Sequence, residues 1–167
     1  MSEFVNTVDS IGDEVLTNSI IDKSITEILD NYVTSIGGSA FFFCSNLITV
    51  NFPAVTSINA NAFNGCTALT TVDLSAAPSI GGSAFYNCSQ LKSLILRSAT
   101  MATLSSASAF SGTPIKSPGT GYIYVPAALV DSYKAANNWS TYANQFRSLE
   151  DYTVDGTTTG ALDASKI

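Results

Sequence analysis

The stretch that decides the fold is Ile36-Gly37-Gly38-Ser39-Ala40-Phe41, which returns in altered form 22 and 44 positions later. The second copy is Ile58-Asn59-Ala60-Asn61-Ala62-Phe63, and the third is Ile80-Gly81-Gly82-Ser83-Ala84-Phe85. Each copy is followed by a cysteine, a leucine and two more apolar residues, and every one of these columns keeps the same spacing. The columns are Cys44, Cys66 and Cys88; Leu47, Leu69 and Leu91; Val50, Val72 and Leu94; and Phe52, Leu74 and Leu96.

The two halves of each copy carry different hydrophobic periods. In the first two copies the last three residues alternate apolar, polar and apolar, which predicts a short strand with one buried face. The segment Ala-Phe-x-x-Cys-x-x-Leu has apolar residues three apart, which suits a helical or 3₁₀ turn on the opposite wall. A fixed period of about 20–29 residues with Leu-x-x-Val-x-Leu ends is typical of leucine-rich repeats. We therefore predict an α/β fold: a right-handed leucine-rich repeat solenoid, rich in β-structure, with short helical turns and a cap at both ends.

These residues resemble the BspA-type leucine-rich repeat family, whose consensus is Ile-Gly-x-x-Ala-Phe-x-x-Cys-x-x-Leu-x-x-Val-x-Phe-Pro. Phe52-Pro53 matches even the terminal Phe-Pro, and the resemblance covers roughly residues 21–126. Such repeats occur in bacterial surface and adhesion proteins, in protozoan surface proteins, and in structural proteins of phages and prophages. The resemblance implies binding or display and not catalysis.

The chain divides into four parts. Residues 1–30 are an acidic arm and capping half-repeat, 31–126 the solenoid, 127–150 a helical cap, and 151–167 a Thr- and Gly-rich tail. In the cap, Pro126 suits the start of a helix from about 127 to 137. The tail has only three large apolar residues in 153–167, so composition predicts disorder. We expect that ordering the tail or the arm requires another protein chain, through self-association or a virion protein.

The segment 1–30 allows two interpretations. Phe4, Val8, Ile11 and Val15 would share one face of a helix. Alternatively, the segment 11–16 is a degenerate repeat, and Ile25 and Ile28, one repeat period before Leu47 and Val50, mark the first strand of the solenoid. We favour the repeat, because an acidic, degenerate first turn is expected of a terminal unit.

Charge and composition exclude several classes of function. The net charge is −6 with no basic cluster, which argues against nucleic-acid binding. No apolar run is long enough to span a bilayer, so we expect no membrane insertion. Met1-Ser2-Glu3-Phe4 lacks the basic and apolar regions of a signal peptide, so we expect no conventional secretion. Between Asn31 and Leu91 the only charged residue is Asp73.

The chain offers no constellation typical of catalysis or metal binding. It has no histidine, so no Ser-His or Cys-His pair is possible, and we predict no enzyme. Its three cysteines lie one to a turn, which suits neither a zinc site nor a disulfide. We predict buried, reduced thiols and no cofactor.

The outward positions of the predicted strands form a candidate binding surface. They are Thr49, Asn51, Thr71, Asp73, Ser93 and Ile95, with Arg97 just beyond. Short hydroxyl and amide side chains suit a glycan or a host protein, and the alternative is a merely solvated sheet. Phe42 and Phe43 are a candidate interface, because they occupy positions expected to be exposed.

We predict a non-enzymatic structural or binding protein, and the resemblance favours a component of a phage virion. It would decorate the capsid or belong to the tail, after synthesis in the bacterial cytoplasm. The alternative is a bacterial cell-surface adhesion module that binds host protein or glycan.

Overall fold

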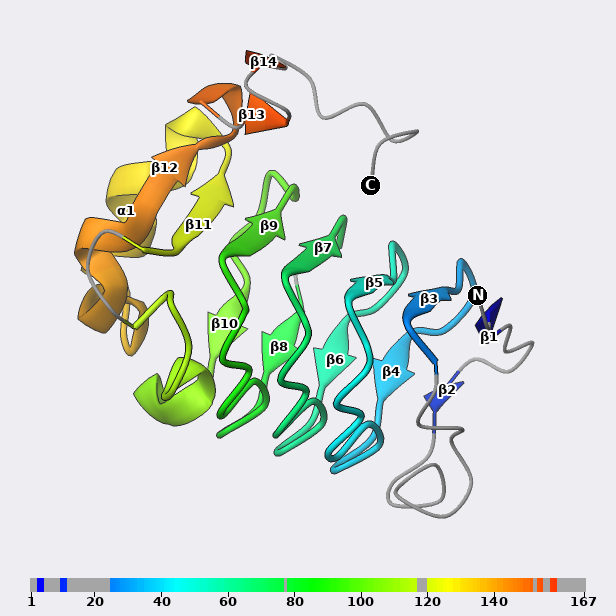
Figure 1. Ribbon diagram of the computed structural model, residues 1–167. Helices are drawn as coiled ribbons and strands as arrows, with labels where there is room; N and C mark the ends of the chain where they lie inside the picture. The colour runs from blue at the N-terminus through cyan, green and yellow to red at the C-terminus, as the bar shows by residue number, and fades with distance from the viewer. Residues whose placement is uncertain are drawn as a thin grey trace.

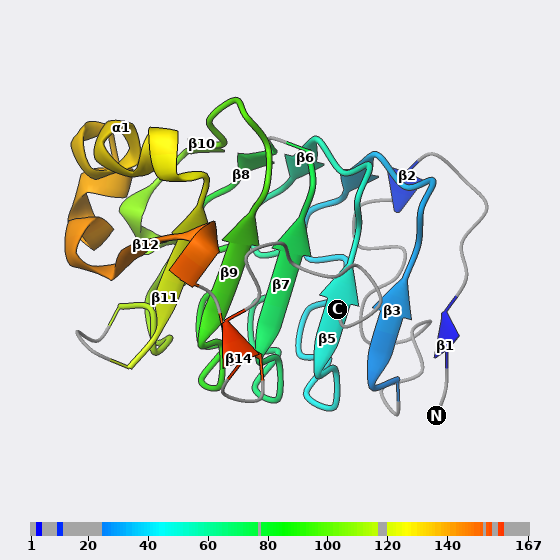
Figure 2. The same ribbon diagram turned by 90° about the horizontal axis from the view of Figure 1, so that it is seen from above.

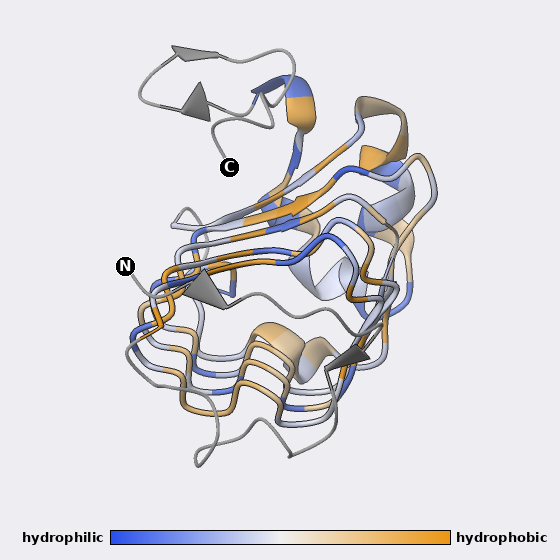
Figure 3. Ribbon diagram, turned by 90° about the vertical axis from the view of Figure 1, so that its right-hand side faces the viewer, coloured by the Kyte–Doolittle hydropathy of each residue, from blue (hydrophilic) through white to orange (hydrophobic). Residues whose placement is uncertain are grey.

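The computed structural model describes residues 25–76, 78–116 and 120–151, together with the backbone of four two-residue strands at the termini. In this part of the chain, short strands stack side by side into two parallel sheets that form two walls of a coil (Figure 1). Figure 3 looks along the coil and shows successive turns one behind the other. The core lies between the two walls.

The larger sheet has seven described strands in the order β1-β3-β5-β7-β9-β11-β12. They are β1 (Glu3–Phe4), β3 (Glu27–Leu29), β5 (Thr49–Asn51), β7 (Thr71–Leu74), β9 (Ser93–Leu96), β11 (Tyr122–Val125) and β12 (Phe146–Ser148). The smaller sheet has the order β10-β8-β6-β4-β2. Its strands are β2 (Ser10–Ile11), β4 (Ser35–Ile36), β6 (Ser57–Ile58), β8 (Ser79–Ile80) and β10 (Thr103–Leu104).

Equivalent repeat positions lie opposite one another in the larger sheet. Val50 pairs with Ile28 on one side and Val72 on the other, and Val72 pairs in turn with Leu94. All of these strand pairs are parallel, as the repeat predicts. Because successive residues of a strand point to opposite faces, these aliphatic side chains all point inward, and all are buried.

The terminal strands support the repeat interpretation of the segment 1–30. β1 pairs with β3 through Phe4 and Ile28, and β2 pairs with β4 through Ile11 and Ile36, both in parallel. The alternative, a helix that carries Phe4 and Ile11 on one face, does not agree with these extended segments. The larger sheet also begins one strand earlier than we predicted, at Glu3 rather than near Ile28.

The wall predicted to hold a helical or 3₁₀ turn in each copy is a succession of tight turns. Within each copy, backbone N–H groups donate to the carbonyl three residues earlier, as Cys44 does to Phe41 at 3.2 Å. Two residues per copy have positive φ, for example Ser39 at 57° and Phe43 at 56°, and this interrupts any longer helix. In the described chain, only the last copy of this segment is a 3₁₀ helix, η1 (Ala107–Phe110).

One phenylalanine from each turn builds an aromatic stack along the core. Phe63 stacks on Phe41 with ring centroids 5.0 Å apart and on Phe85 at 5.3 Å. Phe85 stacks in turn on Phe110 at 5.4 Å, and Phe110 on Trp139 at 6.1 Å. Backbone bonds fix the spacing, because Phe41 N–H donates to Ala62 and Phe63 N–H donates to Ala84, at 2.7 and 2.8 Å.

The three cysteines are free and buried, as predicted. The Cys66 thiol donates to the Phe41 carbonyl at 3.1 Å, and the Cys88 thiol donates to the Phe63 carbonyl at 3.0 Å. In the next turn, Thr113 takes the cysteine position and its hydroxyl donates to the Phe110 carbonyl at 2.7 Å. Small side chains with one donor thus give a second hydrogen bond to carbonyls that already accept a backbone N–H within their own turn.

These thiols are expected to resist modification in the folded protein. The neighbouring Cys88 thiol and burial raise the pKa of Cys66 well above its ordinary value, so the reactive thiolate is scarce at neutral pH. We expect almost no reaction with a thiol reagent such as dithionitrobenzoate in native buffer, and reaction of all three thiols in denaturant. Rapid reaction of all three under native conditions would mean that the column faces solvent.

The C-terminal helices lie against the last turn. They are η2 (Ala127–Leu129), α1 (Val130–Ala135), η3 (Trp139–Gln145) and η4 (Leu149–Asp151). The helix predicted from about 127 to 137 is confirmed in place: Pro126 precedes a 3₁₀ first turn, η2, which runs directly into α1, and the helix ends at Ala135, before the extended backbone of Ala136. Side chains of this region donate hydrogen bonds to backbone carbonyls in β10, the edge strand of the smaller sheet, and in the residue before it. Trp139 Nε1 donates to the Ala102 carbonyl at 2.9 Å, and the Asn138 amide to the Leu104 carbonyl at 2.7 Å.

Beyond Asp151, β13 (Thr153–Val154) and β14 (Thr157–Thr158) pair as an antiparallel hairpin. The predicted disorder of the tail, and the partner chain expected to hold it, otherwise concern positions outside the described residues.

Candidate interaction surface

The strands of the larger sheet lie side by side in Figure 2, and every second residue of each strand points away from the core. We call the outer side of this sheet the strand face. Two rows of residues define it, and within each row the residues of neighbouring strands pair with one another. The first row is Glu27, Thr49, Thr71, Ser93 and Tyr122, and the second is Leu29, Asn51, Asp73, Ile95 and Tyr124.

The structure places the seven predicted surface residues together on the strand face or at its rim. The half-buried members are Thr49, Asn51, Thr71, Ser93 and Arg97. The expectation that Asp73 and Ile95 are exposed is wrong, because they are only 2% and 0% exposed. Asp73 is paired with Arg97, and Ile95 lies between Asp73 and Tyr124 in the register, so neighbouring side chains enclose both.

Asp73 and Arg97 form a bidentate ion pair. Arg97 Nε donates to Asp73 Oδ1 at 2.7 Å, and Nη2 donates to Oδ2 at 2.6 Å. Burial raises the pKa of Asp73 above its ordinary value, although the bonds and charge of Arg97 act in the opposite direction. Burial thus disfavours the charged form of this carboxyl even with Arg97 beside it.

A hollow of about 340 Å³ lies where β3, β5 and β7 end; we call it the strand-end hollow. It is lined by Leu29, Asn31, Asn51, Pro53, Asp73, Ser75 and Arg97. Three of these residues were on the predicted surface. The other four were missed, although Leu29 lies one period before Asn51 and Asn31 one period before Pro53.

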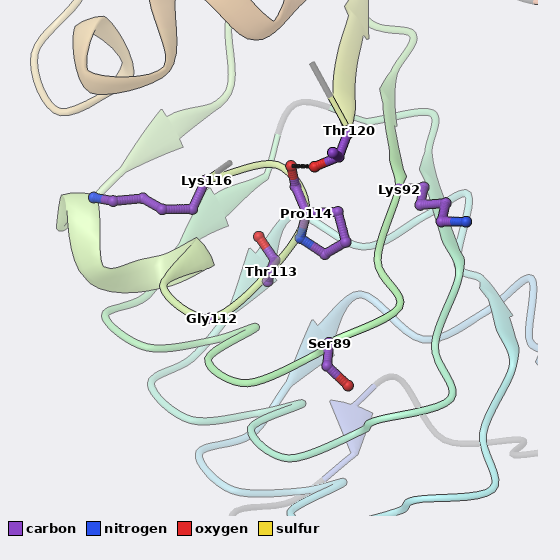
Figure 4. Close-up of a pocket in the computed structure, with 7 residues that line it drawn as sticks. All are labelled: Ser89, Lys92, Gly112, Thr113, Pro114, Lys116 and Thr120. Atoms are coloured by element: carbon purple, nitrogen blue, oxygen red, sulfur yellow. Dashed lines mark hydrogen bonds between the residues drawn. The ribbon is translucent and has the colours of Figure 1, made fainter. Parts of the chain in front are cut away.

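A second hollow, of about 480 Å³, opens beside the turn at 112–116 (Figure 4). Lys92 and Lys116 line it, but the two side chains extend in opposite directions, away from Thr113 and Pro114. The Lys116 ammonium lies 5.6 Å from the centre of the Tyr142 ring. Because the two ammonium groups do not converge, this hollow is not built to hold an anion.

The candidate interface at Phe42 and Phe43 is partly explained within the chain. The Phe43 side chain is 49% exposed, and its ring meets that of Phe42 edge to face at 4.5 Å. It also lies over Gly65, whose positive φ of 78° and missing side chain make room: a Cβ there would come within 2.9 Å of Phe43. Phe42 is half-buried.

The exterior of residues 31–91 carries no exposed charge, because Asp73 is its only charged residue and is buried. We call the part of this exterior that lies outside the strand face and the strand-end hollow the uncharged wall. The large apolar side chains that are exposed in the described chain fall in or beside the same stretch: Leu29, Tyr32, Phe43, Ile48 and Tyr86.

Within the described residues, no three Cys, Asp or Glu side chains are grouped so that they could hold a metal ion. No helix in that part of the chain is long and apolar enough to cross a membrane.

A coil of parallel strands, built from equivalent repeat positions around an aromatic core, defines a leucine-rich repeat module. A family model described as BspA type leucine rich repeat region matches residues 9–120 in six copies, and the chain belongs to this family. The family is typically non-enzymatic; its members are protein-binding or surface repeat modules, and they occur on bacterial surfaces. A comparison with curated proteins found no match.

Proposed function

We propose that the chain is a non-enzymatic structural or binding component of a phage virion, attached to the capsid or the tail and displaying its repeat surface. The observation that supports this most directly is the uncharged wall. Soluble domains normally carry interspersed charges over their whole surface, and exposed apolar side chains without nearby charges are typical of a surface that another protein covers.

The proposal includes the organisation of the chain. The coil is right-handed, as connections between parallel strands almost always are. Residues 1–30 close its acidic end, residues 127–150 close the other, and the solenoid of repeats lies between them. The uncharged wall packs against a virion protein, while the strand face remains available to a ligand.

Co-purification with particles tests the proposal. Phage particles released from cells that carry the gene are purified on a density gradient, and the chain is sought there and in the cell envelope by mass spectrometry. We expect the chain in the particle fraction. Its recovery in the envelope alone would contradict the proposal and favour the alternative, a cell-surface adhesion module.

Charge placed on the uncharged wall provides the matched test. Ile48→Lys and Tyr86→Lys alter exposed side chains and would put an ammonium group into the covered surface. We expect both variants to lose their association with particles. Ser132→Lys, at an exposed position of α1, is the control and is expected to remain associated.

A further inference from the structure

The strand-end hollow has the size of a small ligand site. Its volume of about 340 Å³ lies within the range of about 300–1,000 Å³ that such sites occupy. It is built by consecutive turns: Leu29, Asn51 and Asp73 stand on strands whose backbones are fixed by the parallel ladder, and the other lining residues follow one or two positions after a strand end. A site on such elements is held more rigidly than one on a free loop.

Hydrogen-bonding groups that solvent can reach line this hollow. Asn31, Asn51 and Ser75 line it, and within the described chain none of their side chains makes a hydrogen bond. Each amide has two donors and an acceptor, and the hydroxyl both donates and accepts. The hollow therefore presents donors and acceptors together, which complements a ligand rich in hydroxyl groups.

The charges at the hollow cancel each other. Asp73 and Arg97 are joined by two short bonds, so a bound anion would compete with Asp73 for the guanidinium, and a cation would compete with Arg97. An ionic ligand would have to disrupt this pair. A neutral ligand would leave it intact.

Apolar surface borders the polar lining. Leu29 and Pro53 line the hollow. Asp30 holds the backbone here: its carboxylate accepts hydrogen bonds from the N–H groups of Tyr32 and Val33 at 2.8 and 2.9 Å. Leu29 and Asn31, on either side of Asp30, thus stand on an ordered backbone, and less conformational freedom is lost when a ligand packs against them.

From these features we infer that the strand-end hollow binds a neutral sugar unit of a glycan. A sugar ring presents hydroxyl groups at its edge and C–H groups on its faces, matching the amides and hydroxyl on one side and the apolar border on the other. The inference deepens the proposed function, because it gives the strand face of the displayed module a ligand class.

Nuclear magnetic resonance on the ¹⁵N-labelled protein tests this inference. Glucose, galactose, mannose, N-acetylglucosamine and the charged sugar N-acetylneuraminic acid are titrated in turn. We expect at least one neutral sugar to shift the side-chain amide signals of Asn31 and Asn51, and the charged sugar to leave them unchanged. Asn31→Ala and Asn51→Ala should each weaken binding about tenfold, the worth of one hydrogen bond. Both should fold normally, because these side chains make no hydrogen bond within the described chain.

Asn59→Ala is the matched control, because Asn59 is exposed beyond β6 in the smaller sheet, and sugar binding should be unchanged. Sugars that produce no shift up to about 50 mM, well above the ~1 mM of weak binding, would overturn the inference. Unchanged affinity in Asn51→Ala, or preferential binding of the charged sugar, would also overturn it. Signals that respond to a peptide and to no sugar would replace the glycan with a protein ligand. None of these results affects co-purification with particles, which tests the proposed function separately.

Discussion

Replacing Phe63 with alanine is expected to lower the free energy of unfolding by about 3–5 kcal/mol, the usual cost of deleting a buried aromatic side chain. Phe63 stands at the centre of the aromatic stack, with Phe41 and Phe85 parallel to it on either side. The turns cannot close over the vacancy, because backbone bonds from Phe41 to Ala62 and from Phe63 to Ala84 hold them at fixed spacing. A cavity that cannot collapse gives the larger losses within such series.

Urea unfolding followed by circular dichroism measures this loss. Phe63→Leu should lose less, since it keeps most of the buried apolar volume. Thr67→Ala, at an exposed position of the same turn, should stay within about 0.5 kcal/mol of the wild type. If Phe63→Ala were no more costly than Thr67→Ala, the stack would not be a continuous core element.

Most of the fold could be predicted from the spacing of the repeats. Val50, Val72 and Leu94 were predicted to be buried neighbours on parallel strands because they recur once in every repeat, and a one-residue shift would turn them toward solvent. The wall opposite was harder to predict, since its apolar residues three apart suit a helix as well as a series of turns. Residues with positive φ exclude the continuous helix. Gly65 and Asn87, which share one repeat column, were the sequence signal for this conformation, because Gly and Asn adopt positive φ most readily.

The surface was only partly predictable, because alternation within a strand gives the side of the sheet and not the exposure. Asp73 and Arg97 both point outward from neighbouring strands, and Arg97 lies two residues beyond the position directly opposite Asp73. A diagonal pair of this kind is within reach of a long side chain, so the ion pair could have been predicted from the sequence. The burial of Asp73 and Ile95 depends on how the side chains of three neighbouring turns pack against one another, and the repeat pattern alone does not specify this packing.

The second large effect is expected at the ion pair of Asp73 and Arg97. Arg97→Met should lower the free energy of unfolding at neutral pH by about 3–5 kcal/mol, because it leaves a buried charge without its partner. Asp73→Asn should stay within about 1.5 kcal/mol of the wild type, because the amide is neutral and Arg97 keeps contact with water, its side chain being 22% exposed. The double variant Asp73→Asn/Arg97→Met should recover most of the loss, since no buried charge remains.

The pH dependence separates this explanation from a simple loss of packing. Burial raises the pKa of Asp73, so ionisation of this carboxyl costs the folded state more than the unfolded chain. Its contribution to stability is complete in acid, below the ordinary carboxyl pKa, and is lost as the pH rises through the raised value. Without Arg97 that pKa rises further, so the loss of stability in Arg97→Met should be full at neutral pH and shrink steadily on acidification.

The double variant has no titrating group at position 73, and its difference in stability from Asp73→Asn should not vary with pH. If Arg97→Met and the double variant lost equal stability at every pH, Arg97 would act through its aliphatic contacts and not by compensating the buried carboxylate.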